Sequence, residues 1–292
     1  MKKVSYYLVA AVAAALVVCF WGLHSCKGCG GPDDEKDSTN MELSELPLNI
    51  TVYIDLSDRI VHPGQPSQIE KDTAMIGHVV NYFVEKTKQS ENGLQESKNA
   101  IKILFYPAPT AGLMVKCADE LVLDIPKIPE GTERLHKVMK AKETFQKNLE
   151  QIYQQAITDG NFIGCDIWGF FSYGKAKQQC VREGYRNIMF VLTDGYVYHK
   201  NNIVQKGDSS RFILPKVLNN PKAALEVVSQ SGLENLEVAI MEIQPEDPKH
   251  LPKMKSMLEN WLIDMGVKPE NIIVEETGLP ASTRVTVDNI LK

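Results

Sequence analysis

Short apolar segments alternate with longer segments of helical periodicity along most of this chain, and this alternation limits the fold more than any other feature. The apolar segments are typical of buried strands and cover residues 50–54, 100–106, 187–192, 236–243 and 271–275. Helices are expected at 72–88, 132–156, 166–182, 221–231 and 251–265. Strands separated by helices need right-handed crossovers. We therefore expect an α/β fold with a doubly wound, mainly parallel sheet and helices on both faces.

Local signals refine some of these elements. Asp72 is a typical N-cap residue and is expected to begin the first helix. The long helix at 132–156 is expected to break near Lys142. Two further apolar segments, 113–115 and 121–125, are expected to form a hairpin or short paired strands.

The N-terminal segment predicts export. Lys2 and Lys3 precede an apolar run over residues 6–22, which is the arrangement of a secretory signal and just reaches the length of a membrane span. Ser25 directly before Cys26 resembles the lipobox of bacterial lipoproteins. That resemblance implies cleavage before Cys26, a diacylglycerol on its thiol, and a membrane-anchored protein outside the cytoplasm, at the outer membrane or cell surface. An uncleaved N-terminal anchor helix is the alternative.

A polar spacer follows, at residues 26–46. Its glycines, its proline and the acidic run at residues 33–37 predict a flexible, solvated tether. The acidic run resembles the surface-export signal of lipoproteins in Bacteroidetes-type bacteria, although an ordinary spacer has the same composition. The predicted organisation is a signal peptide over 1–25, a tether over 26–46 and one domain over 47–292 with an insertion around 107–160.

Charge and cysteine content narrow the function classes. The formal net charge of −5 argues against nucleic acid as a partner, because nucleic-acid binding selects for basic surfaces. The cysteines of the expected domain, Cys117, Cys165 and Cys180, form no close pair that would predict a zinc or redox motif. We expect them to be buried thiols.

Polar residues follow two of the expected strands directly. Asp55, Ser57 and Asp58 come after the first strand, and Thr193 and Asp194 come after the strand at 187–192. Ligands of such sheets bind outside the carboxyl ends of the strands, where these side chains would gather. Clustered carboxylates and hydroxyls are ligands that Mg²⁺ or Ca²⁺ prefers.

The two loops together resemble the von Willebrand factor type A (vWA) family. There a D-x-S-x-S loop, a distant threonine and a later T-D-G sequence build a metal-ion-dependent adhesion site. The resemblance covers residues 49–276 and implies metal ligation by Asp55, Ser57 and Asp194. The implied cofactor is Mg²⁺, or Ca²⁺ or Mn²⁺, and an acidic residue of a protein partner would complete the coordination.

Two departures from the family pattern affect whether the site can bind a metal ion. Arg59 stands where the family has its second serine, and Cys165 stands at the threonine position of a Gly164-Cys165-Asp166-Ile167 loop. A guanidinium here could pair bidentately with Asp55 or Asp194 and replace the ion. Asp166 or Asp58 could instead supply an extra oxygen ligand. Thr132 is a second candidate for the family's threonine. For Asp55 and Asp194, the alternative to metal ligation is a structural role in capping turns.

The leading hypothesis is a lipid-anchored binding module that recognises a protein partner through the strand ends. The residues expected to contact the partner are Arg59, Thr193, Tyr196, Tyr198 and His199. A metal-free scaffold of an envelope complex is the alternative. A metal-dependent hydrolase using Asp55 and Asp194 is a further alternative, although no nucleophile–base pair is recognisable in the sequence.

Overall fold

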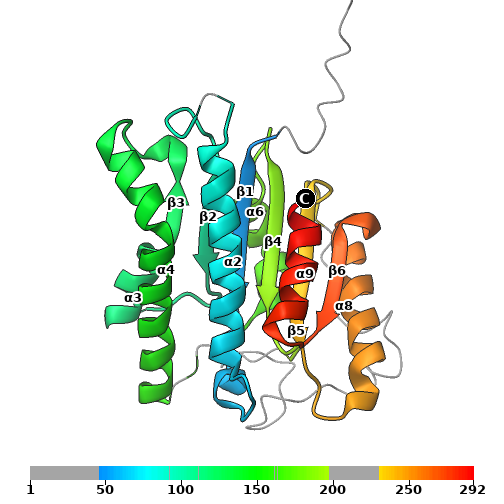
Figure 1. Cartoon of the computed structure of the whole chain (residues 1–292). Coiled ribbons are helices and arrows are strands. Elements are labelled where there is room, and N and C mark those ends of the chain that lie inside the picture. Colours follow the sequence, from blue (N-terminus) through cyan, green and yellow to red (C-terminus); the bar gives the residue numbers. More distant parts are fainter. Residues whose placement is uncertain (1–45, 92, 111, 161, 163, 197–229) are drawn as a thin grey trace, which may run out of the picture. The chain divides into compact units, whose positions relative to one another are not determined.

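The structure, a computed structural model, describes residues 46–91, 93–110, 112–160, 162, 164–196 and 230–292. Its described part contains a six-stranded sheet in the order β3-β2-β1-β4-β5-β6 (Figure 1). The strands are β1 (Leu48–Ile54), β2 (Ala100–Leu104), β3 (Val122–Asp124), β4 (Arg186–Leu192), β5 (Leu236–Ile243) and β6 (Ile272–Glu276). Only β3, which is antiparallel to β2, departs from the parallel pairing of these strands. The predicted α/β fold class is confirmed.

Helices cover both faces of this sheet. They are α2 (Gln68–Lys88), α3 (Gly112–Asp119), α4 (Thr132–Asp159), α5 (Ile167–Ser172), α6 (Lys175–Cys180), α8 (Leu251–Met265) and α9 (Pro280–Leu291). The side chains of β1 alternate between two apolar cores, as the two-residue period of a strand requires. Ile50 and Ile54 pack with α2, α4 and α9, whereas Tyr53 packs with α5, α6 and α8. Figure 1 shows α2 and α9 in front of the sheet and α6 behind it.

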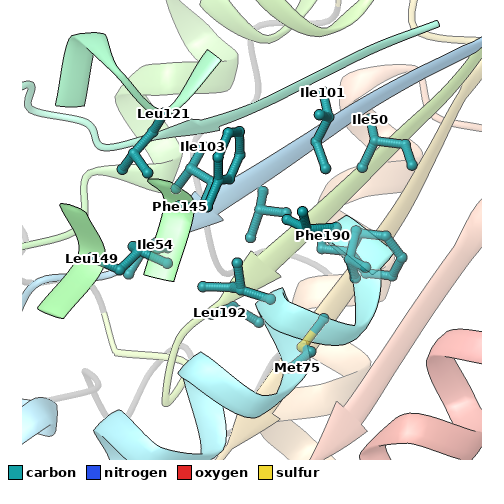
Figure 2. Packing of buried hydrophobic residues seen from close by; sticks show 14 of the residues in the cluster. Ile50, Ile54, Met75, Ile101, Ile103, Leu121, Phe145, Leu149, Phe190 and Leu192 are labelled. Carbon is teal, nitrogen blue, oxygen red and sulfur yellow. The ribbon is translucent and has the colours of Figure 1, made fainter. Parts of the chain in front are cut away.

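The first of these cores holds α2 and α4 against the sheet. Figure 2 shows Met75 of α2 and Leu149 of α4 converging on Ile54 and Leu192 at the ends of β1 and β4. All four side chains are at most 4% exposed. Burial of this kind stabilises by about 1.5–3 kcal/mol for each large apolar side chain, so both helices are firmly positioned beside the strand ends.

The first helix begins earlier than the sequence suggested. Ser67, not Asp72, is the N-cap of α2, and it forms a capping box with Glu70. In this box the Ser67 N–H donates to Glu70 Oε2 at 2.7 Å, and the Glu70 N–H donates to Ser67 Oγ at 3.3 Å. Asp72 therefore lies inside the helix, where it is fully buried.

Three other expectations about local structure were wrong. The helix α4 runs unbroken through Lys142, because its buried residues keep helical spacing on both sides of that position. Residues 113–115 belong to α3 rather than to a strand, and β3 pairs with β2 instead. The helix expected at 166–182 is divided into α5 and α6 by Gly174, whose φ of 70° is left-handed.

Further findings concern helix α9, the helix expected at 221–231 and the cysteines. The helix α9 was not anticipated, and the helix expected at 221–231 lies almost entirely outside the described residues. Cys117, Cys165 and Cys180 are free and buried, as predicted. Within the described ranges, none of the helices has both the length and the apolar character to cross a membrane.

Candidate functional site

The two polar loops meet where the strand order reverses. The chain leaves β1 for β2 on one side and returns to β4 on the other, which makes the carboxyl ends of β1 and β4 the switch point of the sheet. The Asp55 N–H donates to the Leu192 carbonyl at 2.9 Å. The Thr193 hydroxyl donates to Asp55 Oδ2 at 2.8 Å. We call the loops at residues 55–62, 164–166 and 193–196 the rim.

The loop at residues 164–166 is tied to the loop at residues 55–62 by backbone contacts. The Gly164 N–H donates to the Leu56 carbonyl at 3.1 Å, and the two residues form an isolated β-bridge. Asp166 caps α5, because its Oδ1 accepts from the Gly169 N–H at 2.8 Å. A Cβ on Gly169 would lie only 2.3 Å from the Asp166 carboxylate, so any other residue there would displace this cap. Asp166 thus has a structural role at the rim.

Cys165 does not offer its sulfur to the rim surface. It is fully buried, and its Sγ lies 3.6 Å from the Tyr53 hydroxyl, to which it donates. Burial raises the pKa of the Cys165 thiol well above its usual value, and Asp55 raises it further. Thr132, the competing residue, is at the other edge of the sheet. The N–H of its neighbour Gly131 donates to Gln95 Oε1 at 2.8 Å, and Gln95 precedes β2.

Arg59 is the centre of a buried ionic network. Its Nη2 lies 2.6 Å from Asp72 Oδ2 and its Nη1 lies 3.3 Å from Asp72 Oδ1, a bidentate pair. Its Nε donates to the Asp55 carbonyl at 2.9 Å and is 4.0 Å from Asp55 Oδ2. The expected bidentate partner, Asp55 or Asp194, was therefore wrong, because α2 brings Asp72 in line with the guanidinium.

Two further side chains complete the coordination of Asp72. The Tyr153 hydroxyl of α4 donates to Asp72 Oδ2 at 2.7 Å, and the Gln68 amide donates to Oδ1 at 2.9 Å. Arg59 is 2% exposed and Asp72 is 0% exposed, so this ion pair is buried away from solvent. It joins the loop after β1 to α2 and to α4.

The electrostatics keep Arg59 charged. Burial alone would lower the pKa of Arg59, but the carboxylates of Asp72 and Asp55 raise it above its ordinary value. Burial raises the pKa of Asp55, and this is opposed by Arg59 and by the Thr193 hydrogen bond. Burial also raises the pKa of Tyr153 well above its usual value, and Asp72 adds to this. The guanidinium is thus the fixed positive charge of the rim.

These residues do not fit a divalent cation. Asp55 Oδ1 accepts from the Ser57 N–H at 2.8 Å and Oδ2 accepts from Thr193, so internal donors already hold both carboxylate oxygens. Arg59 adds a positive charge beside them, and Cys165 supplies buried sulfur where Mg²⁺ prefers oxygen. Among the residues that the structure describes, no three His, Cys, Asp or Glu side chains are placed to hold a metal.

The other predicted site residues have structural contacts. Asp58 lies 3.9 Å from His62 in a partly exposed pair. Asp194 Oδ1 accepts from the Tyr196 N–H at 3.1 Å, and Tyr196 is buried, with its hydroxyl accepting from the Glu246 N–H at 3.1 Å. Tyr198 and His199, like Cys26, lie outside the described residues.

Sequence reasoning missed Asp72, Gln68 and Tyr153 as members of the network. A signal was present for Asp72, because it shares the apolar stripe of α2 with Met75 and Ile76. An acidic residue on a buried helix face needs a cationic or hydrogen-bonding partner. Nothing in the spacing, however, indicates which residue that partner is.

Comparison with known proteins adds fold-level likenesses only. No protein-family model matches the sequence, and no curated protein is similar to it. Proximal thread matrix protein 1 from the mussel byssus is 11% identical with a TM-score of 0.41; the match covers 84% of this chain and 47% of that one. An aerotolerance-related membrane protein from Bacteroides fragilis is 14% identical with a TM-score of 0.39 (84% and 98% covered). BatB from Bacteroides thetaiotaomicron is 12% identical with a TM-score of 0.37 (83% and 98% covered). This chain thus spans less than half of the mussel protein.

Proposed function

We propose that this protein is a membrane-tethered binding module of the cell envelope that recognises a protein partner through the rim without a divalent cation. The tether and the lipid anchor at Cys26 are the part of the proposal that rests on sequence alone. The single observation that carries the rest is the buried Arg59 guanidinium, held by Asp72 and by the Asp55 carbonyl.

The network suits a binding surface because it fixes the rim before any partner arrives. Arg59, Asp72 and Tyr153 join three segments that are far apart in the chain. Loops that are already ordered lose little conformational entropy on binding. In the family that the sequence resembles, the ion organises the equivalent loops; here Arg59 would do so permanently.

The same geometry favours binding over hydrolysis. Asp55 is fully buried and Asp194 is 4% exposed, and both carboxylates accept hydrogen bonds from the protein itself. A general base must reach the proton that it removes from the substrate. Neither carboxylate is presented to a substrate in this way.

Site-specific photo-crosslinking in intact membranes tests the proposal. A photoreactive residue at the partly exposed Asp58 or His62 of the full-length chain should capture a defined partner. The matched control is Glu234, an exposed residue just before β5, at the opposite edge of the sheet. Capture should be unchanged by a chelator. Equal capture from Glu234 would contradict rim recognition, and loss with the chelator would contradict the cation-free part.

A further inference from the structure

The face formed by α2, α4 and α9 carries a groove. Its volume is about 810 Å³, and α4 contributes Lys142, Gln146 and Glu150 to its lining. On the α2 side the wall of the groove is shallow, because the small residues Ala74 and Gly77 line it there. A Cβ built on Gly77 meets nothing within 4 Å. A helix of another molecule could therefore approach closely.

The exposed residues that continue this groove along α4 form one stripe. Its members recur at the three- or four-residue spacing, or its multiple, that keeps side chains on one helix face. They are Leu135, Met139, Lys142, Gln146, Glu150 and Ile157. Leu135, Met139 and Ile157 are large apolar side chains that are 47%, 57% and 39% exposed. The Gln146 amide donates to Glu150 at 3.0 Å, which keeps that carboxylate on the stripe.

Two pairs of this stripe are placed symmetrically about Gln146, whereas the position symmetric to Met139 is the buried Tyr153. Lys142 and Glu150 lie at equal distances before and after it, and so do Leu135 and Ile157. If two copies of α4 run antiparallel and cross at Gln146, each Lys142 faces the other copy's Glu150. Each Leu135 likewise faces the other copy's Ile157. Opposite charges and apolar side chains are thus matched in the self-complementary way that a twofold interface requires.

We propose that a second copy of this chain binds this face, α4 against α4, with the twofold axis at Gln146. The helix has 28 residues, so it is about 42 Å long, and a standard interface needs about 800 Å² of contact per copy. The pairing does not rest on the proposed function.

A charge exchange between two tagged full-length copies tests this pairing. Lys142→Glu alone places two carboxylates opposite each other at both contacts, and Glu150→Lys alone places two ammonium groups there. Each variant should weaken self-association by roughly 10- to 100-fold, measured by co-purification of the two tags from solubilised membranes. Mixing Lys142→Glu copies with Glu150→Lys copies should restore wild-type association, because both contacts again join opposite charges.

Two controls make the result specific to the stripe. Lys140→Glu changes the same charge on the side of α4 where Lys140 pairs with Glu143, and it should leave association unchanged. Gln146→Cys should give an oxidised cross-linked dimer, whereas Lys140→Cys should not; the described native cysteines are buried. A wild-type chain that never co-purifies with itself would overturn the proposal, as would a mixture no better associated than the single variants.

Discussion

Two arginine–carboxylate pairs stand at opposite ends of the sheet and differ mainly in burial. At the rim, Arg59 and Asp72 are 2% and 0% exposed. At the other end, Arg186 pairs with Glu237 through two contacts of 2.7 Å, and these side chains are 11% and 21% exposed. The geometry is bidentate in both pairs. The difference in solvent exposure therefore decides how much stability is lost when one member of a pair is removed.

The outer pair mainly anchors a helix end. Arg186 also donates to the carbonyls of Ile290 and Leu291, the last residues of α9, at 2.6 and 3.3 Å. Cations are favourable at a helix C-terminus, and water screens the loss of any one partner. The inner pair has no such screening. A buried pair adds little net stability, but removing one member leaves an uncompensated charge in a dry site.

The largest expected effect follows from removing the buried carboxylate. Asp72→Asn should lower the free energy of unfolding by about 3–5 kcal/mol, because Arg59 then stays buried without its bidentate partner and keeps only the Asp55 carboxylate, 4.0 Å away. Urea unfolding of the purified chain measures this. Asp264→Asn, at an exposed position on α8, is the matched control and should change little. A loss below about 1 kcal/mol for Asp72→Asn would remove the distinction between the two pairs.

Removing the arginine of the inner pair, instead of its carboxylate, sharpens the comparison. Arg59→Ser removes the guanidinium that lies 4.0 Å from Asp55 Oδ2 and pairs with Asp72, so Mg²⁺ should bind this variant but not the wild type. At 100 times its dissociation constant, Mg²⁺ would then stabilise the variant by about 2.7 kcal/mol. Calorimetry and thermal melts with and without Mg²⁺ measure this. Wild-type protein that binds the ion equally well would show that Arg59 does not replace it.

A smaller effect is expected from the tyrosine of the network. Tyr153→Phe removes a hydrogen bond to a buried carboxylate, worth about 1.5–3 kcal/mol. The raised pKa of Tyr153 also means that the folded state keeps a proton that the unfolded state releases above about pH 10. Wild-type stability should therefore fall as the pH rises above 10, and it should fall less steeply in the variant. Urea unfolding at about pH 8 and about pH 11 compares these slopes; equal slopes would contradict the assignment.

The smallest effect is expected at the outer pair. Glu237→Gln should cost about 1 kcal/mol or less, and high salt should reduce the difference from wild type. The effect of Asp72→Asn should be insensitive to salt, since the inner pair is dry. Unfolding both variants at low and high salt makes the comparison direct, and similar salt responses would argue against it.

Much of the fold was predictable because buried parallel strands have a strong local pattern. The apolar runs of β1, β4 and β5 marked both the strands and the positions where they end. The segment at 113–115 was misassigned because so short an apolar run does not distinguish a strand from a helix. At the site, the approach of Thr193 to Asp55 followed from parallel strand ends meeting at one edge. The ionic partner of Arg59 did not follow from the positions of the strand ends.

By itself the sequence determined that two polar loops would meet at one edge of a parallel sheet. The carboxyl ends of parallel strands lie at the same edge, and both loops directly follow such strands. The tertiary structure decided what holds those loops. Tyr153 lies 81 residues beyond Asp72, and only the packing of α2 and α4 on the same face of the sheet places both beside Arg59. Long-range pairing of this kind depends on helix positions, which local sequence patterns do not encode.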